Sequence, residues 1–116
     1  MVWRIEMPKL RTVRGMRDFL PDDAVKMRYA EGLSRELGRL YGYEEVITPI
    51  VESYRLLAAK SGEEIRERMY SFKDLGGRKV ALRPEFTASI ARLVATKMRN
   101  EPKPMRLYCC GSLYRY

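Results

Sequence analysis

The segment between Pro21 and Pro49 constrains the possible folds of this chain more than any other. Apolar side chains recur across residues 22–41 at three- and four-residue spacing, which predicts one helix with a single apolar face. This apolar stripe consists of Val25, Tyr29, Leu33, Leu37 and Leu40. Pro21 suits the first turn of a helix, and Gly42 suits its end. Residues 43–48 then form a predicted strand, which ends at Pro49 because proline cannot donate to a central ladder.

Shorter elements are predicted in the middle of the chain. Residues 54–60 favour a short helix, and the charged residues 63–68 are expected to be exposed. Residues 69–73 and 79–83 are predicted strands joined by Asp74-Leu75-Gly76-Gly77-Arg78. The glycines of this connection suit a tight turn, so the two strands are expected to form a hairpin.

A second amphipathic helix is predicted after the hairpin. Thr87 can act as its N-cap, and Asn100-Glu101-Pro102-Lys103-Pro104 ends it. The residues of its apolar face are Ile90, Leu93, Val94 and Met98. Residues 105–116 are then a predicted strand that is interrupted at Gly111.

The order of these elements indicates the fold class. Residues 1–20 are expected to be irregular or extended, and no repeat or low-complexity tract divides residues 1–116, which we treat as one unit. The predicted strands are linked by a hairpin and by helices rather than by regular βαβ crossovers. We therefore expect an α+β domain with a mostly antiparallel sheet flanked by helices.

Charge narrows the possible partners. The chain carries 23 Lys and Arg against 15 Asp and Glu, a net charge of +8. Such an excess favours polyanions such as nucleic acid, nucleotide phosphates or an acidic membrane surface. The charges also alternate in sign, as in Glu63-Glu64-Ile65-Arg66-Glu67-Arg68, which is equally typical of a solvated, salt-bridged surface. The chain has no histidine, so any catalysis must proceed without the usual general base.

The two cysteines, Cys109 and Cys110, are adjacent in the sequence. This is not the spaced pattern that holds zinc, and we interpret them as strand residues that point to opposite faces. No stretch fits a transmembrane helix, and Met1-Val2-Trp3-Arg4 lacks the apolar core of a signal peptide, so a cytoplasmic location is expected.

Three motifs together resemble class II aminoacyl-tRNA synthetases. The first runs from the helix into the proline-terminated strand, over residues 37–51. It resembles motif 1, which in that family forms the homodimer interface. Taken alone, a helix followed by glycine, a strand and proline occurs in many folds.

The second motif is Ala81-Leu82-Arg83-Pro84-Glu85-Phe86-Thr87-Ala88. Residues 82–88 resemble the amino-acid-binding loop of histidyl-tRNA synthetases, which carries Arg-Pro-Glu-x-Thr. The resemblance implies that Glu85 and Thr87 hold the α-amino group of L-histidine, with Phe86 lining the pocket. An ammonium group needs a carboxylate and further acceptors, and both residues supply them. The family often has glycine at the position of Phe86.

The third motif covers residues 107–116 and resembles the start of motif 2. The family's arginine, which contacts the α-phosphate of ATP and the amino-acid carboxylate, matches Arg115. Joining these two anions requires a fixed positive charge and no base, because the attacking carboxylate is already ionised. The alternatives without a role in binding are that Arg115 is an ordinary surface arginine on a strand, and that Glu85 and Thr87 only stabilise the start of a helix.

Arg14-Gly15-Met16-Arg17-Asp18-Phe19-Leu20-Pro21 also resembles the N-terminal signature of histidyl-tRNA synthetases. The family resemblance implies a partial catalytic domain of a histidine–tRNA ligase that uses L-histidine, ATP and histidine tRNA, and that forms homodimers. It also implies magnesium, with ligands and further motifs beyond Tyr116, so the isolated chain is expected to be inactive. Two alternatives remain open: a non-catalytic regulatory paralogue of ATP phosphoribosyltransferase, and a small basic nucleic-acid-binding module.

Overall fold

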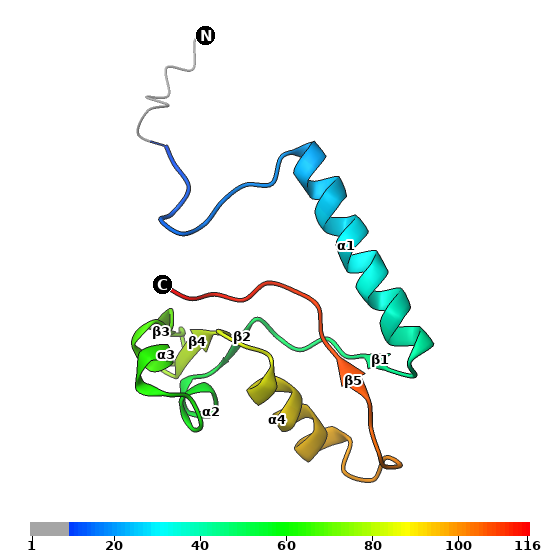
Figure 1. Ribbon diagram of the computed structural model, residues 1–116. Coiled ribbons are helices and arrows are strands. Elements are labelled where there is room, and N and C mark those ends of the chain that lie inside the picture. Colours follow the sequence, from blue (N-terminus) through cyan, green and yellow to red (C-terminus); the bar gives the residue numbers. More distant parts are fainter. Residues whose placement is uncertain (1–9) are drawn as a thin grey trace.

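A computed structural model describes residues 10–116 of the chain, and its first helix is also its longest (Figure 1). Helix α1 covers Pro21–Leu40, close to the predicted 22–41. Residues 10–20 contain neither helix nor strand, as expected, and the rest of that prediction falls on residues 1–9, outside the described part. Pro21 occupies the first helical turn, and two acidic residues follow it at the positive end of the helix dipole.

Helix α1 is terminated where the sequence predicts, by a glycine in the left-handed region two residues after Leu40. Gly42 has φ +77°, a conformation that costs little only without a Cβ. The amide nitrogen of Gly42 donates to the carbonyl of Arg39 at 3.1 Å, and that of Tyr43 donates to Gly38 at 2.8 Å. These two bonds form a Schellman motif, which satisfies carbonyls that the last helical turn would leave unpaired.

The central sheet has three antiparallel strands in the order β2-β4-β3. Strands β3 (Ser71–Lys73) and β4 (Lys79–Leu82) form the predicted hairpin. Asp74 stabilises its turn, because its Oδ1 accepts from the amides of Gly76 and Arg78 at 3.0 and 2.9 Å. These bonds to the charged form hold the pKa of Asp74 below its usual range.

Strand β2 (Val51–Ser53) was not predicted, and it pairs with β4. A second pairing is parallel and joins β1 (Glu44–Glu45) to β5 (Leu107–Tyr108). The strands predicted over 43–48 and 105–116 are therefore much shorter than expected. The physical reason is that a run of extended residues becomes a strand only where a partner lies beside it, and these partners are distant in sequence.

Three short helices complete the fold: α2 (Tyr54–Ala58), α3 (Glu63–Glu67) and α4 (Thr87–Lys97). Helix α2 was predicted, but α3 was expected only as an exposed charged segment. The N-cap of α4 is Phe86 and no side chain caps it, so the prediction of Thr87 as N-cap is wrong by one residue. The core consists of Leu57 of α2, Ala81 of β4 and Met69, which lies just before β3.

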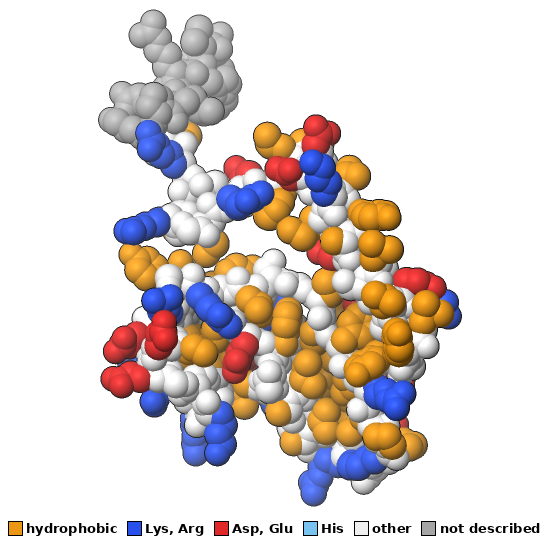
Figure 2. Space-filling view, in the orientation of Figure 1, with side chains coloured by type: hydrophobic (Ala, Val, Ile, Leu, Met, Phe, Trp, Pro, Cys, Tyr) orange, Lys and Arg blue, Asp and Glu red, His pale blue; other side chains and the backbone are white. Residues whose placement is uncertain are grey.

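The apolar stripe of α1 faces away from this core. Its five residues are between 52% and 70% exposed, and no residue of α1 is buried. Figure 2 shows hydrophobic side chains running along this helix. Helix α1 approaches the rest of the structure at its C-terminal end, where a Cβ added to Gly38 would lie 3.1 Å from the Tyr108 ring. Within residues 10–116, no helix has the length and apolar content needed to cross a membrane.

Candidate active site

The loop that carries Glu85 and Thr87 begins where β4 ends. Its first residue, Arg83, is bonded to two other segments through its backbone. The amide nitrogen of Arg83 donates to the carbonyl of Ile50 at 2.9 Å, and its carbonyl accepts from the amide of Tyr114 at 3.0 Å. Pro84, which follows, is fully buried. The loop is therefore fixed at its origin before it reaches α4.

Arg115 lies directly against this loop. Its Nε donates to the carbonyl oxygen of Pro84 at 3.0 Å, while the residue as a whole is exposed. The structure thus brings together two motifs that are about thirty residues apart in the sequence. Pro84 directly precedes Glu85, so the guanidinium of Arg115 contacts the loop backbone one residue before that carboxylate.

A basic cavity of about 470 Å³ surrounds Arg115. Its lining residues are Arg14, Gly15, Arg68, Tyr70 and Tyr116, together with Arg115 itself. The Tyr70 and Tyr116 rings meet edge to face at 6.1 Å between centroids. Among the described residues, three arginines and no carboxylate line this cavity, which favours an anionic ligand such as a phosphate group.

The predicted amino-acid-binding residues differ in exposure. Glu85 and Phe86 are half-buried, whereas Thr87 is exposed at the start of α4. The guanidinium of Arg83 lies 4.7 Å from the centroid of the Phe86 ring, within the range of a cation–π contact. The aromatic side chain at position 86 therefore has a structural partner within its own loop.

This arrangement suits a reaction between two anions. A half-buried carboxylate can bind an ammonium group, and an arginine that contacts the backbone of the same loop can bind a carboxylate and a phosphate. Guanidinium groups neutralise charge that develops on phosphate oxygens during transfer. The nucleophile in such a reaction is already ionised, so the absence of histidine from the sequence is no obstacle.

Sequence reasoning missed Arg83 as a residue with its own role. Its side chain is 6% exposed and binds carbonyls on two distant segments. It also missed a buried ion pair in which Arg92 of α4 meets both oxygens of Glu52 at 2.8–3.2 Å. The available signals were the place of Arg83 in the Arg-Pro-Glu-x-Thr motif and, at each position, a charged residue where the strand or helix pattern calls for an apolar one.

Both cysteines are free thiols and partly buried. The Sγ of Cys109 donates to the carbonyl of Val46 at 3.2 Å, and burial raises the pKa of the Cys109 thiol. A raised pKa leaves less of the reactive thiolate at neutral pH, so Cys109 is not placed as a nucleophile. No group of three or more His, Cys, Asp or Glu in residues 10–116 is placed to hold a metal ion.

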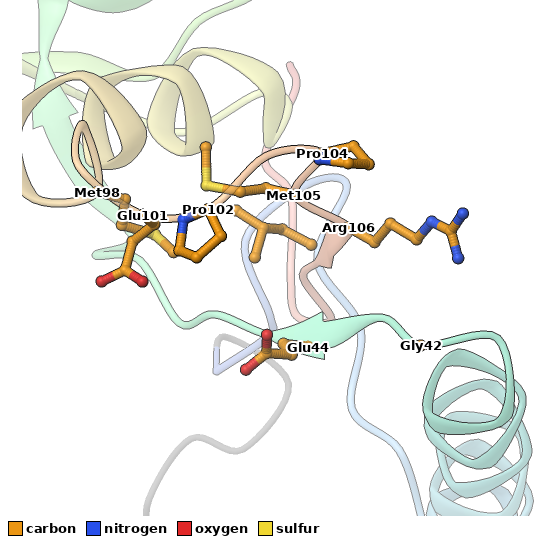
Figure 3. Close-up of a pocket in the computed structure, with 9 residues that line it drawn as sticks. Gly42, Glu44, Met98, Glu101, Pro102, Pro104, Met105 and Arg106 are labelled. Carbon is orange, nitrogen blue, oxygen red and sulfur yellow. The ribbon is translucent and has the colours of Figure 1, made fainter.

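A separate cavity of about 540 Å³ lies between the loop after α4 and strands β1 and β5 (Figure 3). Glu44 of β1 lies on one side, and Glu101 and Pro102 lie on the other. None of the predicted site residues lines this cavity. Its wall contains residues from the end of α4, so it is distinct from the site built around Arg115.

Sequence comparison finds relatives for nearly the whole chain. The family model described as histidyl-tRNA synthetase matches residues 15–116. The histidine–tRNA ligase of Saccharolobus islandicus is 51% identical over 110 residues, which cover 95% of this chain and 26% of the relative. The chain thus spans about a quarter of the length of this curated relative.

Solved structures share the fold. The apo histidyl-tRNA synthetase of S. aureus superposes with a TM-score of 0.80 and 41% identity, covering 92% of this chain and 30% of that one. An ATP phosphoribosyltransferase regulatory subunit/histidyl-tRNA synthetase from Bacillus halodurans C superposes with a TM-score of 0.82 and 30% identity, covering 92% and 28%.

Proposed function

Because the chain belongs to the histidyl-tRNA synthetase family, we propose that it supplies part of the amino-acid and ATP site of a histidine–tRNA ligase. The ligase joins the carboxylate of L-histidine to the α-phosphate of ATP, which releases pyrophosphate and forms histidyl-adenylate. The histidyl group then passes to its tRNA. The observation that carries this proposal is the 3.0 Å bond between Arg115 and the carbonyl of Pro84.

Each site residue has a role in this proposal. Glu85 and Thr87 bind the α-amino group of histidine, and Phe86 lines the pocket beside them. Arg115 binds the carboxylate of histidine and the α-phosphate of ATP, so it neutralises both anions as they react. The net charge of +8 suits a tRNA partner. We expect the enzyme to act in the cytoplasm. Magnesium accompanies ATP in this proposal, held by groups other than the residues described here.

The 116-residue chain alone is expected to have little or no activity, because its relatives are about four times as long. The test compares this chain with a chimera in which it replaces the matching 110 residues of the Saccharolobus islandicus ligase. Amino-acid-dependent ATP–pyrophosphate exchange is measured for both proteins with each standard amino acid. We expect exchange with histidine only, and only in the chimera.

Other outcomes lead to different functions. A folded chimera that shows no exchange with any amino acid would remove the ligase function and favour the regulatory paralogue of ATP phosphoribosyltransferase. The Bacillus halodurans relative is described both as an ATP phosphoribosyltransferase regulatory subunit and as a histidyl-tRNA synthetase, so this paralogue is the second candidate. Salt-sensitive RNA binding that is indifferent to histidine and ATP would instead support a nucleic-acid-binding module.

We also propose that the chain forms homodimers through α1 and the strand that follows, over residues 22–51. The apolar stripe is exposed along the whole helix, and burying it removes apolar surface from water. Leu33→Glu places a charge in the middle of the stripe and is expected to give monomers in sedimentation. Ser34→Glu makes the same change of charge about 120° around the helix from the centre of the stripe, so it is the control and is expected to remain dimeric. Monomers of the unmodified chain at every concentration would contradict this proposal.

A further inference from the structure

Arg83 is a buried cation that joins three parts of the chain. Its Nε donates to the carbonyl of Ser112 at 3.0 Å, and its Nη1 donates to the carbonyl of Thr48 at 3.0 Å. Nη1 also lies 3.4 Å from the hydroxyl of Thr48. Thr48 is 35 residues before Arg83, and Ser112 is 29 residues after it. One side chain therefore connects the end of the motif 1 segment, the loop and the start of motif 2.

The acceptors around Arg83 are neutral. Burying a guanidinium in contact with carbonyl and hydroxyl oxygens costs desolvation energy that a carboxylate partner would repay more fully. An apolar residue of similar size is often as good for stability at such a position. Stability alone is therefore a poor reason for an arginine here, whereas a planar group with several fixed donors suits the holding of separate segments in register.

The surroundings of Arg83 fit its side chain closely. A Cβ added to Gly111 would lie 2.6 Å from Nη2 of Arg83, closer than real Cβ contacts. The Phe86 ring covers the guanidinium at 4.7 Å from its centroid. Position 111 thus requires glycine while Arg83 holds this conformation, and Phe86 further limits the guanidinium.

We propose that Arg83 is a positioning residue, which fixes the loop carrying Glu85 and Thr87 relative to the segment carrying Arg115. The proposal rests on the proposed function of those residues. Two bonds already link the two segments, each at 3.0 Å: the amide of Tyr114 donates to the carbonyl of Arg83, and Nε of Arg115 donates to the carbonyl of Pro84. The bonds from Arg83 to Ser112 and Thr48 add side-chain anchors to the same junction. A shift of about 1 Å in such a site lowers the rate by about 100-fold.

Arg83→Lys in the chimera tests this proposal. Lysine keeps the charge but lacks the planar fork, so it cannot hold Ser112 and Thr48 together. We expect kcat/KM for histidine to fall by about 10- to 100-fold, mostly through a higher KM for histidine. KM for ATP is expected to change less. A merely structural role would reduce the folded fraction, which lowers apparent kcat and leaves both KM values unchanged.

Arg92→Lys is the matched control, because Arg92 is a partly buried arginine that binds Glu52, not this loop. It is expected to lower the melting temperature and leave the KM for histidine unchanged. An unmodified chimera without histidine-dependent exchange would remove the proposed function itself. An active chimera whose Arg83→Lys variant keeps its KM for histidine would overturn only the positioning role.

Gly111→Ala provides a second route that leaves Arg83 in place, in case Arg83→Lys does not fold. The added methyl group displaces the guanidinium, so the KM for histidine is expected to rise as in Arg83→Lys. In the double variant the shorter lysine head removes the clash, and the combined effect should be smaller than the product of the two. An unchanged KM in Gly111→Ala, measured with the fold intact by circular dichroism, would overturn the proposal.

Discussion

Replacing Arg115 with alanine in the chimera is expected to lower kcat for histidine-dependent ATP–pyrophosphate exchange by about 100- to 1,000-fold. This is the usual effect of removing one fixed donor that stabilises charge in a transition state. Arg115→Lys keeps a positive charge without the bidentate fork, so its kcat should lie between those of the alanine variant and the unmodified chimera.

Arg68→Ala is the control for Arg115. Arg68 lines the same basic cavity, but its side chain pairs with Glu64 at 3.4 Å, whereas that of Arg115 donates to Pro84 in the loop. Its removal changes the charge of the cavity by the same amount without touching the loop. We expect kcat close to that of the unmodified chimera. Equal losses in both variants would mean that the total charge matters rather than the position of Arg115.

Arg92→Ala is expected to destabilise the chain by about 3–5 kcal/mol, measured by urea unfolding. The side chain of Glu52 is 7% exposed and that of Arg92 is 30% exposed, so the change leaves a buried carboxylate without its partner. Glu52→Ala leaves an arginine that can reach water, and its cost should be smaller. The free energy of unfolding of a domain of this size is only about 5–15 kcal/mol.

Two further variants separate the ion pair from general effects of charge. The double variant Glu52→Leu with Arg92→Met replaces the pair by apolar side chains and should recover most of the lost stability. Arg39→Ala breaks the exposed pair with Glu36 and should have little effect. An Arg92→Ala variant as stable as the unmodified chain would contradict the importance of the pair.

The sequence alone was sufficient to predict those helices and strands whose start and end residues lie close together in the chain. Helix α1 begins at a proline and ends at a glycine with φ +77°, and both can be read from the sequence. The hairpin of β3 and β4 follows from alternating residues around Asp74 and its glycines. The α+β class and the mostly antiparallel sheet followed from the order of these elements, and the family relationship confirmed them.

The sequence was insufficient where the partner is distant. Strands β1 and β5 pair across more than sixty residues, so neither their parallel direction nor their length of two residues is encoded nearby. The same holds for Arg83 with Thr48 and for Glu52 with Arg92, which are 35 and 40 residues apart. The resemblance to a known family located Glu85, Phe86, Thr87 and Arg115, whose roles stay predictions. Arg83 belongs to the same motif, but the resemblance assigned it no role.

The way α1 is attached determines how it responds to force. Its described anchors lie near its C-terminal end: Arg35 to Glu45 at 3.0 Å, Arg106 to the carbonyl of Tyr41 at 3.3 Å, and the close approach of Gly38 to Tyr108. Towards Pro21, a cavity of about 580 Å³ separates the helix from Ile50. Helix α1 is about 30 Å long and is thus attached to the rest of the described structure mainly near its C-terminal end. A force that moves the N-terminal part of this helix sideways is therefore transmitted to Tyr108, the strand residue that precedes the segment carrying Arg115.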